Sequence, residues 1–261
     1  MYHGNSKAPK LIVFGDSHAG MLASGIIKHI AKPFHVTTYL VAGGFQGGKY
    51  LSTLPLPGLT RRVPGNQANF DRSAQKQLHD AMRALKQDKE SVLLVSFSYI
   101  DQFPTLATID NHQLLSIDLA TASNPSEYAP FLVALERLRL QLGGRSLILM
   151  GDVPQSSYKP IECMVPVRWL SYLKRCDKQD AEDRHLGSQH INAVLSDYAN
   201  KHQKVFFIDP YVSFCVKGYC QNLNPAGVPY YSDGNHLSKT GANHWLRQEK
   251  ELILSAIGLN R

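Results

Sequence analysis

Residues 10–18 read KLIVFGDSH, and this stretch decides how the chain folds. The apolar run over residues 10–15 ends in glycine and shows no alternation with polar side chains, which is typical of a strand buried on both faces. A helix is expected next, because apolar residues recur at helical spacing over residues 21–30. Ser17 therefore lies between the first strand and the first helix.

The rest of the chain continues this alternation of strands and helices. Strand-like runs at residues 34–41, 91–98, 145–151 and 204–209 alternate with helical patterns at 71–87, 125–142, 179–202 and 240–257. This order predicts an α/β domain in which helices cover both faces of a parallel five-stranded sheet. Catalytic groups are then expected at the carboxyl ends of the strands. We expect one domain over residues 10–261, preceded by an extension or linker at residues 1–9.

Composition and charge limit the classes of protein to which this chain can belong. The net charge is +7, but the Lys and Arg residues are scattered, which favours a solvated basic surface over a nucleic-acid partner. No stretch approaches the roughly 20 apolar residues that span a bilayer. Residues 1–9 lack the apolar core of a signal peptide. The chain as given is expected to be soluble, with any targeting segment outside it.

A second motif, SDGNHLSKTGA at residues 232–242, precedes the last predicted helix. It supplies Asp233 and His236, which with Ser17 make a candidate nucleophilic triad. A serine hydroxyl becomes nucleophilic when an imidazole takes its proton and a carboxylate fixes the imidazole. Taken singly, Ser17 is a common helix N-cap, Asp233 a common Asx-turn residue, and His236 an ordinary surface histidine. Their joint placement favours catalysis.

The neighbouring residues suggest how the site is completed. His18, beside the candidate nucleophile, is interpreted as a structural or pocket-lining residue rather than the base. The backbone N–H of Ser17, at a helix N-terminus, is expected to face a developing oxyanion. A second donor is expected from Gly43 or Gly44.

The four cysteines form two pairs that are close in sequence, Cys163 with Cys176 and Cys215 with Cys220. Two disulfides would suit an oxidising compartment, and four reduced thiols would suit the cytosol. A zinc site is less favoured, because neither pair has CxxC spacing. No metal is predicted.

GDSH near one end and DGNHLS near the other resemble the SGNH, or GDSL-type, hydrolase superfamily. The resemblance implies a flavodoxin-like three-layer α/β/α sandwich. MGDVPQ at residues 150–155, FIDPYVSFCVKGYC at 207–220 and VPYYSDGNHLSKTGA at 228–242 are similar to the SGNH domains that follow an integral-membrane acyltransferase-3 module in bacterial O-acetyltransferases.

The resemblance assigns roles to particular residues. Ser17 matches the nucleophile, Asp233 and His236 match the family's DxxH pair, and Gly44 matches the second-block glycine that donates to the oxyanion. The third-block asparagine is missing, since residues 95–99 read VSFSY. Ser98 is the nearest small donor there.

The resemblance also implies a setting. The domain is expected in the periplasm, as part of an inner-membrane protein whose acyltransferase-3 module uses acetyl-CoA, and its acceptor is expected to be a glycan such as lipopolysaccharide O-antigen. No cofactor is expected to bind the domain directly. In that compartment, Cys215 is expected to pair with Cys220, and Cys163 with Cys176.

Three functions are compatible with these residues. The first is a serine O-acyltransferase, and the second is a carbohydrate O-acetylesterase that uses the same triad. The third is a catalytically idle glycan-binding domain, which the missing asparagine and the aromatic residues Phe45, Tyr50, Tyr230 and Tyr231 would favour.

Overall fold

A computed structural model describes residues 2–5, 10–42, 67–99, 125–155, 178–180 and 186–259. Its elements in chain order are β1 (Leu11–Gly15), α1 (Ser17–Met21), α2 (Ala23–Ile26), the π-helix η1 (Ile27–Ala31), β2 (Thr38–Ala42), α3 (Gln67–Leu85), β3 (Val92–Ser96), α6 (Pro125–Gln141), β4 (Leu147–Met150), β5 (Lys178–Asp180), α8 (Leu186–Asn200), β6 (Val205–Ile208), α9 (Pro210–Phe214), β7 (Cys215–Val216), β8 (Tyr219–Gln221) and α10 (Lys239–Ala256).

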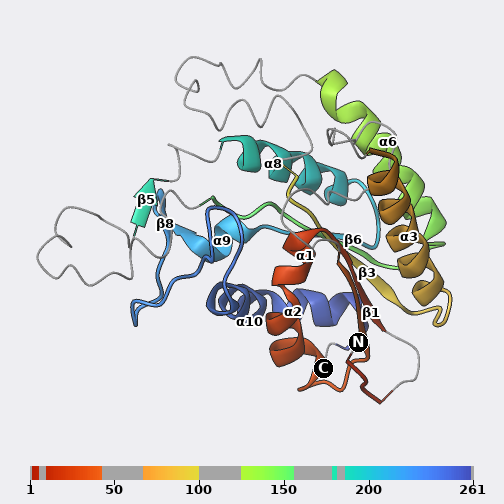
Figure 1. The fold of residues 1–261 in the computed structure, drawn as a ribbon, viewed down its shortest axis with the longest axis horizontal. Helices are drawn as coiled ribbons and strands as arrows, with labels where there is room; N and C mark the ends of the chain where they lie inside the picture. Colours follow the sequence, from red (N-terminus) through yellow and green to blue (C-terminus); the bar gives the residue numbers. More distant parts are fainter. Residues whose placement is uncertain are drawn as a thin grey trace, which may run out of the picture.

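The central sheet has five parallel strands in the order β2-β1-β3-β4-β6, which confirms the predicted α/β fold. Figure 1 shows α3, α6 and α8 on one side of this sheet, and α1, α2 and α10 on the other. The chain order of the strands reverses between β1 and β3. In open sheets of this type, ligands bind at the carboxyl ends of the strands where that reversal occurs.

Two apolar clusters hold the three layers together. Alternate side chains of the strands enter each cluster: Ile12 and Phe14 pack under α3, α6 and α8, whereas Leu11 and Val13 pack under α1, α2 and α10. Both faces of β1 are therefore buried, as its continuous apolar run predicts. Trp245 of α10 is completely buried in the second cluster.

The pairing of β1 with β3 depends on close backbone approach at Gly15. A Cβ atom at this position would collide with the carbonyl oxygen of Ser96, the residue that pairs with Gly15 in β3. Only glycine fits there, so the first strand can lie against the third up to the residue before Asp16.

The structure corrects several local predictions. The helix expected after Ser17 is divided into α1, α2 and a π-helical turn, η1. The helix expected over residues 179–202 starts only at Leu186, and residues 178–180 instead form β5. This strand pairs with β8, and β8 with β7, in a small antiparallel sheet that residue patterns did not indicate. Strands this short carry little periodicity.

The predicted amino-terminal extension contacts the domain where the structure describes it. The backbone of Tyr2 exchanges two hydrogen bonds of 2.9 Å with Thr38 at the outer edge of β2. In the described ranges, no helix is both long enough and apolar enough to cross a bilayer.

Candidate active site

The turn between β1 and α1 presents Ser17 at the carboxyl edge of the sheet. Asp16, not Ser17, is the N-cap of α1: its Oδ1 accepts a hydrogen bond of 2.8 Å from the N–H of His18. Its Oδ2 accepts a second one, of 3.0 Å, from the N–H of Ser98 after β3. The capping interpretation of Ser17 is therefore wrong, and its hydroxyl is directed elsewhere.

The other half of the site is the loop before α10. Tyr231 and Leu237 form a β-bridge across this loop, and the N–H of Ser232 donates to the carbonyl oxygen of His236 at 2.8 Å. Asp233 Oδ1 accepts from the N–H groups of Asn235 and His236, so Asp233 does start an Asx turn. That turn places its carboxylate beside the imidazole three residues later.

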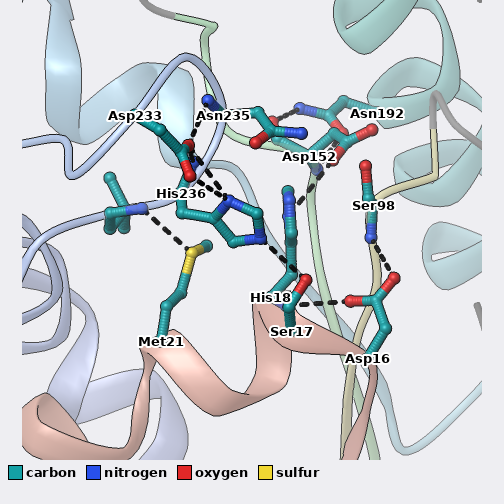
Figure 2. Close-up of polar contacts among 11 residues, drawn as sticks. Asp16, Ser17, His18, Met21, Ser98, Asp152, Asn192, Asp233, Asn235 and His236 are labelled. Carbon is teal, nitrogen blue, oxygen red and sulfur yellow. Dashed lines mark hydrogen bonds and ion pairs between the residues drawn. The ribbon is translucent and has the colours of Figure 1, made fainter. Parts of the chain in front are cut away.

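Three side chains lie in one hydrogen-bonded line, which Figure 2 shows. His236 Nδ1 lies 2.8 Å from Asp233 Oδ2, and His236 Nε2 lies 2.7 Å from Ser17 Oγ. A carboxylate only accepts, so Nδ1 carries the proton and donates it to Asp233. Nε2 then has a lone pair directed at the Ser17 hydroxyl, which is the arrangement of a general base poised on a nucleophile.

The pKa of the Asp233 carboxyl is lower than its ordinary value. Partial burial raises the pKa of this carboxyl, but hydrogen bonds from the His236 ring and from the N–H groups of Asn235 and His236 outweigh burial and lower the pKa to about 2. Asp233 is therefore ionised at neutral pH and available to stabilise an imidazolium on His236.

His18 lies behind the nucleophile and does not contact it as a base. It is buried, and burial, with a smaller contribution from His236, lowers its pKa to about 3. Its Nδ1 lies 3.6 Å from Asp152 Oδ1, and its ring packs edge-on against that of His236 with centroids 5.1 Å apart. These contacts agree with a structural or pocket-lining residue.

Of the expected oxyanion donors, Ser17 and Ser98 lie among the described residues. Within the described residues, nothing accepts from the N–H of Ser17, in the first turn of α1, so this group can face substrate. Ser98 is buried beside the site, but its backbone N–H is engaged by Asp16. Gly43 and Gly44, the expected second donors, lie outside the described residues.

Two residues of the site were not found from sequence. Asp152 follows β4, and its backbone is held on both sides by Asn192 of α8, whose Oδ1 accepts from the Asp152 N–H at 2.7 Å and whose Nδ2 donates to the Asp152 carbonyl at 2.9 Å. A Gly-Asp pair stands at the carboxyl end of both buried strands, at residues 15–16 after β1 and at residues 151–152 after β4. This repeated pair is the sequence signal that could have indicated Asp152.

The cysteine prediction is confirmed where the structure describes it. Cys215 and Cys220 form a disulfide between β7 and β8. Cys163 and Cys176 lie outside the described residues. Among the residues that are described, no three His, Cys, Asp or Glu side chains gather as a metal site would require.

Two of the four aromatic residues that would favour glycan binding lie in the core instead. Tyr230 and Tyr231 are buried and pack against Phe214. Phe45 and Tyr50 lie outside the described residues.

Known proteins resemble this chain in sequence and in fold. A family model described as "SGNH domain (fused to AT3 domains)" matches residues 2–248. No curated protein matches the chain. A solved structure of the lipopolysaccharide acetyltransferase periplasmic domain of Salmonella ser. Paratyphi A is similar, with a TM-score of 0.66 at 14% identity, over 95% of this chain and 85% of that one.

Two further solved structures are more distant. A putative platelet activating factor from Streptococcus pneumonia has a TM-score of 0.43 at 12% identity, over 97% of this chain and 87% of its own. The salicylyl-acyltransferase SsfX3, from a tetracycline biosynthetic pathway, has a TM-score of 0.38 at 11% identity, over 98% of this chain and 56% of its own.

Proposed function

Because the chain belongs to the family of SGNH domains fused to AT3 domains, we propose that it transfers an acetyl group to a hydroxyl of a bacterial envelope polysaccharide, such as lipopolysaccharide O-antigen. Membership makes the chain an enzyme of the acyl-transfer or esterase type. The observation that carries the proposal is the contact of 2.7 Å between Ser17 Oγ and His236 Nε2.

The first half of the reaction forms an acyl-serine. Ser17 Oγ attacks the carbonyl carbon of the acetyl donor while its proton passes to His236 Nε2, and Asp233 stabilises the resulting imidazolium. The oxyanion faces the N–H of Ser17, where the helix N-terminus favours negative charge. When the tetrahedral intermediate collapses, the bond to the leaving group breaks and the leaving group takes the proton from Nε2.

The second half reverses these steps with a new hydroxyl. A sugar hydroxyl gives its proton to Nε2 and attacks the acyl carbon, and Ser17 leaves with the proton returned by His236. The product is an acetylated sugar. Water in place of the sugar would release acetate, so the same groups also support the alternative, a carbohydrate O-acetylesterase.

The proposal includes a partner and a location. An integral-membrane module of the AT3 type, in the same full-length protein, would use acetyl-CoA and supply the acetyl group on the periplasmic side. Its support is the fusion that defines the family, together with the similar fold of the Salmonella lipopolysaccharide acetyltransferase periplasmic domain. The disulfide between Cys215 and Cys220 suits an oxidising compartment.

A catalytically idle glycan-binding domain is the less supported alternative. An idle domain has no need of an aligned serine, imidazole and carboxylate, yet all three are in hydrogen-bonding contact. Tyr230 and Tyr231 are buried, so two of the aromatic residues that would favour glycan binding are not available to stack on a sugar.

Hydrolysis of p-nitrophenyl acetate tests the triad. Ser17→Ala and His236→Ala are each expected to lower kcat by at least about 10³-fold, because the triad acts as a unit. Ser255→Ala, which removes an exposed serine of α10, is the matched control and is expected to keep the parent rate. Mass spectrometry should find an acetyl group on Ser17 after rapid quenching. Equal rates in the parent and the three variants would contradict the proposal.

A separate pair of assays distinguishes acetyl transfer to the glycan from hydrolysis of the acetylated glycan. The full-length protein in membranes is given acetyl-CoA and an unacetylated O-antigen, and the domain alone is given the acetylated glycan. Acetyl gain in the first assay supports transfer, whereas acetate release in the second without any gain in the first supports the esterase.

A further inference from the structure

A second imidazole and carboxylate lie directly behind the first pair. His18 belongs to α1 and Asp152 follows β4, so the two residues come from different elements and converge beside His236, as Figure 2 shows. The rings of His18 and His236 meet at an interplanar angle of 64°, and Asp152 Oδ1 lies 3.6 Å from His18 Nδ1. Both residues are 1% exposed.

The His236 side of the site is open to solvent by comparison. The side chain of His236 is 29% exposed and that of Asp233 is 56% exposed. Both belong to one short loop, so the contact between them does not by itself hold the ring toward Ser17. The N–H of Leu237 donates to Met21 Sδ at 3.1 Å, which anchors the loop backbone on α1. From α1, the His236 ring receives the edge of His18 in addition to the Ser17 hydroxyl.

His18 is poorly explained as a packing residue alone. Its Nε2 is buried and has no hydrogen-bond partner in the described structure. A buried polar atom without a partner is costly, and an apolar ring of similar size would avoid that cost. Buried polar groups that weaken a fold are characteristic of functional sites. The imidazole therefore calls for an explanation in terms of the reaction.

We propose that His18 and Asp152 are positioning residues for His236: the His18 ring fixes the plane of the His236 imidazole, and the Asp152 carboxylate strengthens that imidazole as a base. This inference rests on the proposed function, in which His236 takes the proton of Ser17. Asn192 completes the arrangement, since it holds the backbone of Asp152 through both its N–H and its carbonyl oxygen.

Charge explains why the inner pair supports the outer one. His18 stays neutral because burial lowers its pKa to about 3, so it does not repel an imidazolium on His236. Among the described residues, the acidic groups around the two rings are Asp152 after β4, Asp233 from the loop and Asp16, whose carboxylate accepts from the backbone N–H of His18. Negative charge near an imidazole favours its protonated form, so each carboxylate raises the basicity of His236.

The test is an NMR titration of the His236 imidazole in the folded domain, with Ser17 present. The variants are Asp152→Asn, which removes the charge and keeps the shape, and His18→Phe, which keeps a ring and removes its polar atoms. His202→Phe is the matched control, because His202 also packs on an aromatic ring, that of Tyr198, and lies 3.5 Å from Glu136.

Asp152→Asn is expected to lower the pKa of His236 by about 0.5 to 1 unit, because it removes a negative charge near the imidazole. His18→Phe replaces a neutral ring and is expected to leave this pKa within about 0.2 unit. The control is expected to leave it unchanged. In the ester assay both variants should lose about tenfold in kcat while KM stays within about twofold.

A His236 pKa that moves by less than about 0.2 unit in folded Asp152→Asn would overturn the role of the carboxylate, and an unchanged kcat in folded His18→Phe would overturn the role of the ring. If His18→Phe does not fold, the titration of Asp152→Asn decides alone. The titration needs no turnover, so it separates the two proposals: an inactive parent with the expected pKa shifts would remove the proposed function but not the support of His236 by the inner pair.

Discussion

Asp16 joins the nucleophile to the sheet through two hydrogen bonds from different elements. Its carboxylate accepts from the N–H of His18 in α1 and from the N–H of Ser98 after β3. The carboxylate therefore fixes the turn that carries Ser17 relative to the neighbouring strand. It also lies at the N-terminus of α1, where negative charge is favourable.

Replacing Asp16 should cost both stability and rate. Asp16→Ala removes a helix cap and leaves the buried N–H of Ser98 without its acceptor, so we expect the free energy of unfolding to fall by about 2 kcal/mol. We also expect kcat for ester hydrolysis to fall by about tenfold or more, because Ser17 loses its fixed position. Urea denaturation and steady-state kinetics measure the two effects.

Asp88→Ala is the control for this prediction. Asp88 accepts from the N–H of Glu90 in the turn before β3, at the opposite end of that strand. We expect it to affect stability alone. If Asp16→Ala unfolds as readily as expected but turns over at the parent rate, Asp16 serves the fold and not the position of Ser17.

Helices α6 and α8 are joined by a polar cluster around Glu136. Its carboxylate accepts from Arg139 at 2.8 Å on the same helix and from the hydroxyl of Tyr198 on α8, also at 2.8 Å. The hydrogen bond from Arg139 is the largest cause that lowers the pKa of Glu136, to about 2, against a smaller opposing effect of burial. The folded protein therefore holds Glu136 ionised at a pH where the unfolded chain binds a proton.

This difference makes stability depend on pH. A carboxyl whose pKa is lower in the folded state stabilises the fold fully above its ordinary value, near 4.5, and loses that contribution as pH falls toward about 2. Glu136→Gln should therefore lower the free energy of unfolding at pH 7 by about 0.5 to 1 kcal/mol, and by almost nothing near pH 2. Urea denaturation at a series of pH values measures this.

The solvent exposure of Glu136 keeps the expected effect small. Glu90→Gln is a suitable control, since Glu90 is exposed and its carboxylate pairs with the partly exposed Lys10. A difference between Glu136→Gln and the parent that stays the same from pH 7 to pH 2 would show that the side chain acts through shape and not through charge.

Across the whole molecule, the site depends on two segments at opposite ends of the chain. Ser17 and His236 are separated by 219 positions. The helices next to them, α1, α2 and α10, pack in one apolar cluster that includes Leu22, Ile26 and Trp245. Ser17 and His236 are therefore held together by the same core that covers one face of the sheet.

Activity should consequently survive until the fold is lost. We expect the urea midpoint for loss of ester hydrolysis to coincide with the midpoint for loss of far-ultraviolet circular dichroism, as in a cooperative transition. The two curves are to be measured on the same samples at equilibrium. Activity that disappears at clearly lower urea would show that the loop carrying His236 opens independently of the core.

The residue patterns determined those features that depend on contiguous sequence. The five strands of the parallel sheet were predicted because a buried strand is a short apolar run, and such runs are visible in 91–98 or 145–151 without knowledge of the fold. The proximity of Asp233 and His236 was predicted because three residues of a turn separate them. The pairing of Cys215 with Cys220 was implied by family resemblance and is confirmed by the structure.

Only the tertiary structure decided the contacts between distant segments. The 2.7 Å contact of Ser17 with His236, the capping of α1 by Asp16 and the convergence of His18 with Asp152 all depend on how helices pack across the sheet. Short-range periodicity carries no information on such distances, because it records which face of one element is apolar and not which element covers that face. The residues of the candidate site are thus recognisable from local motifs, whereas the distances between them are set by long-range packing.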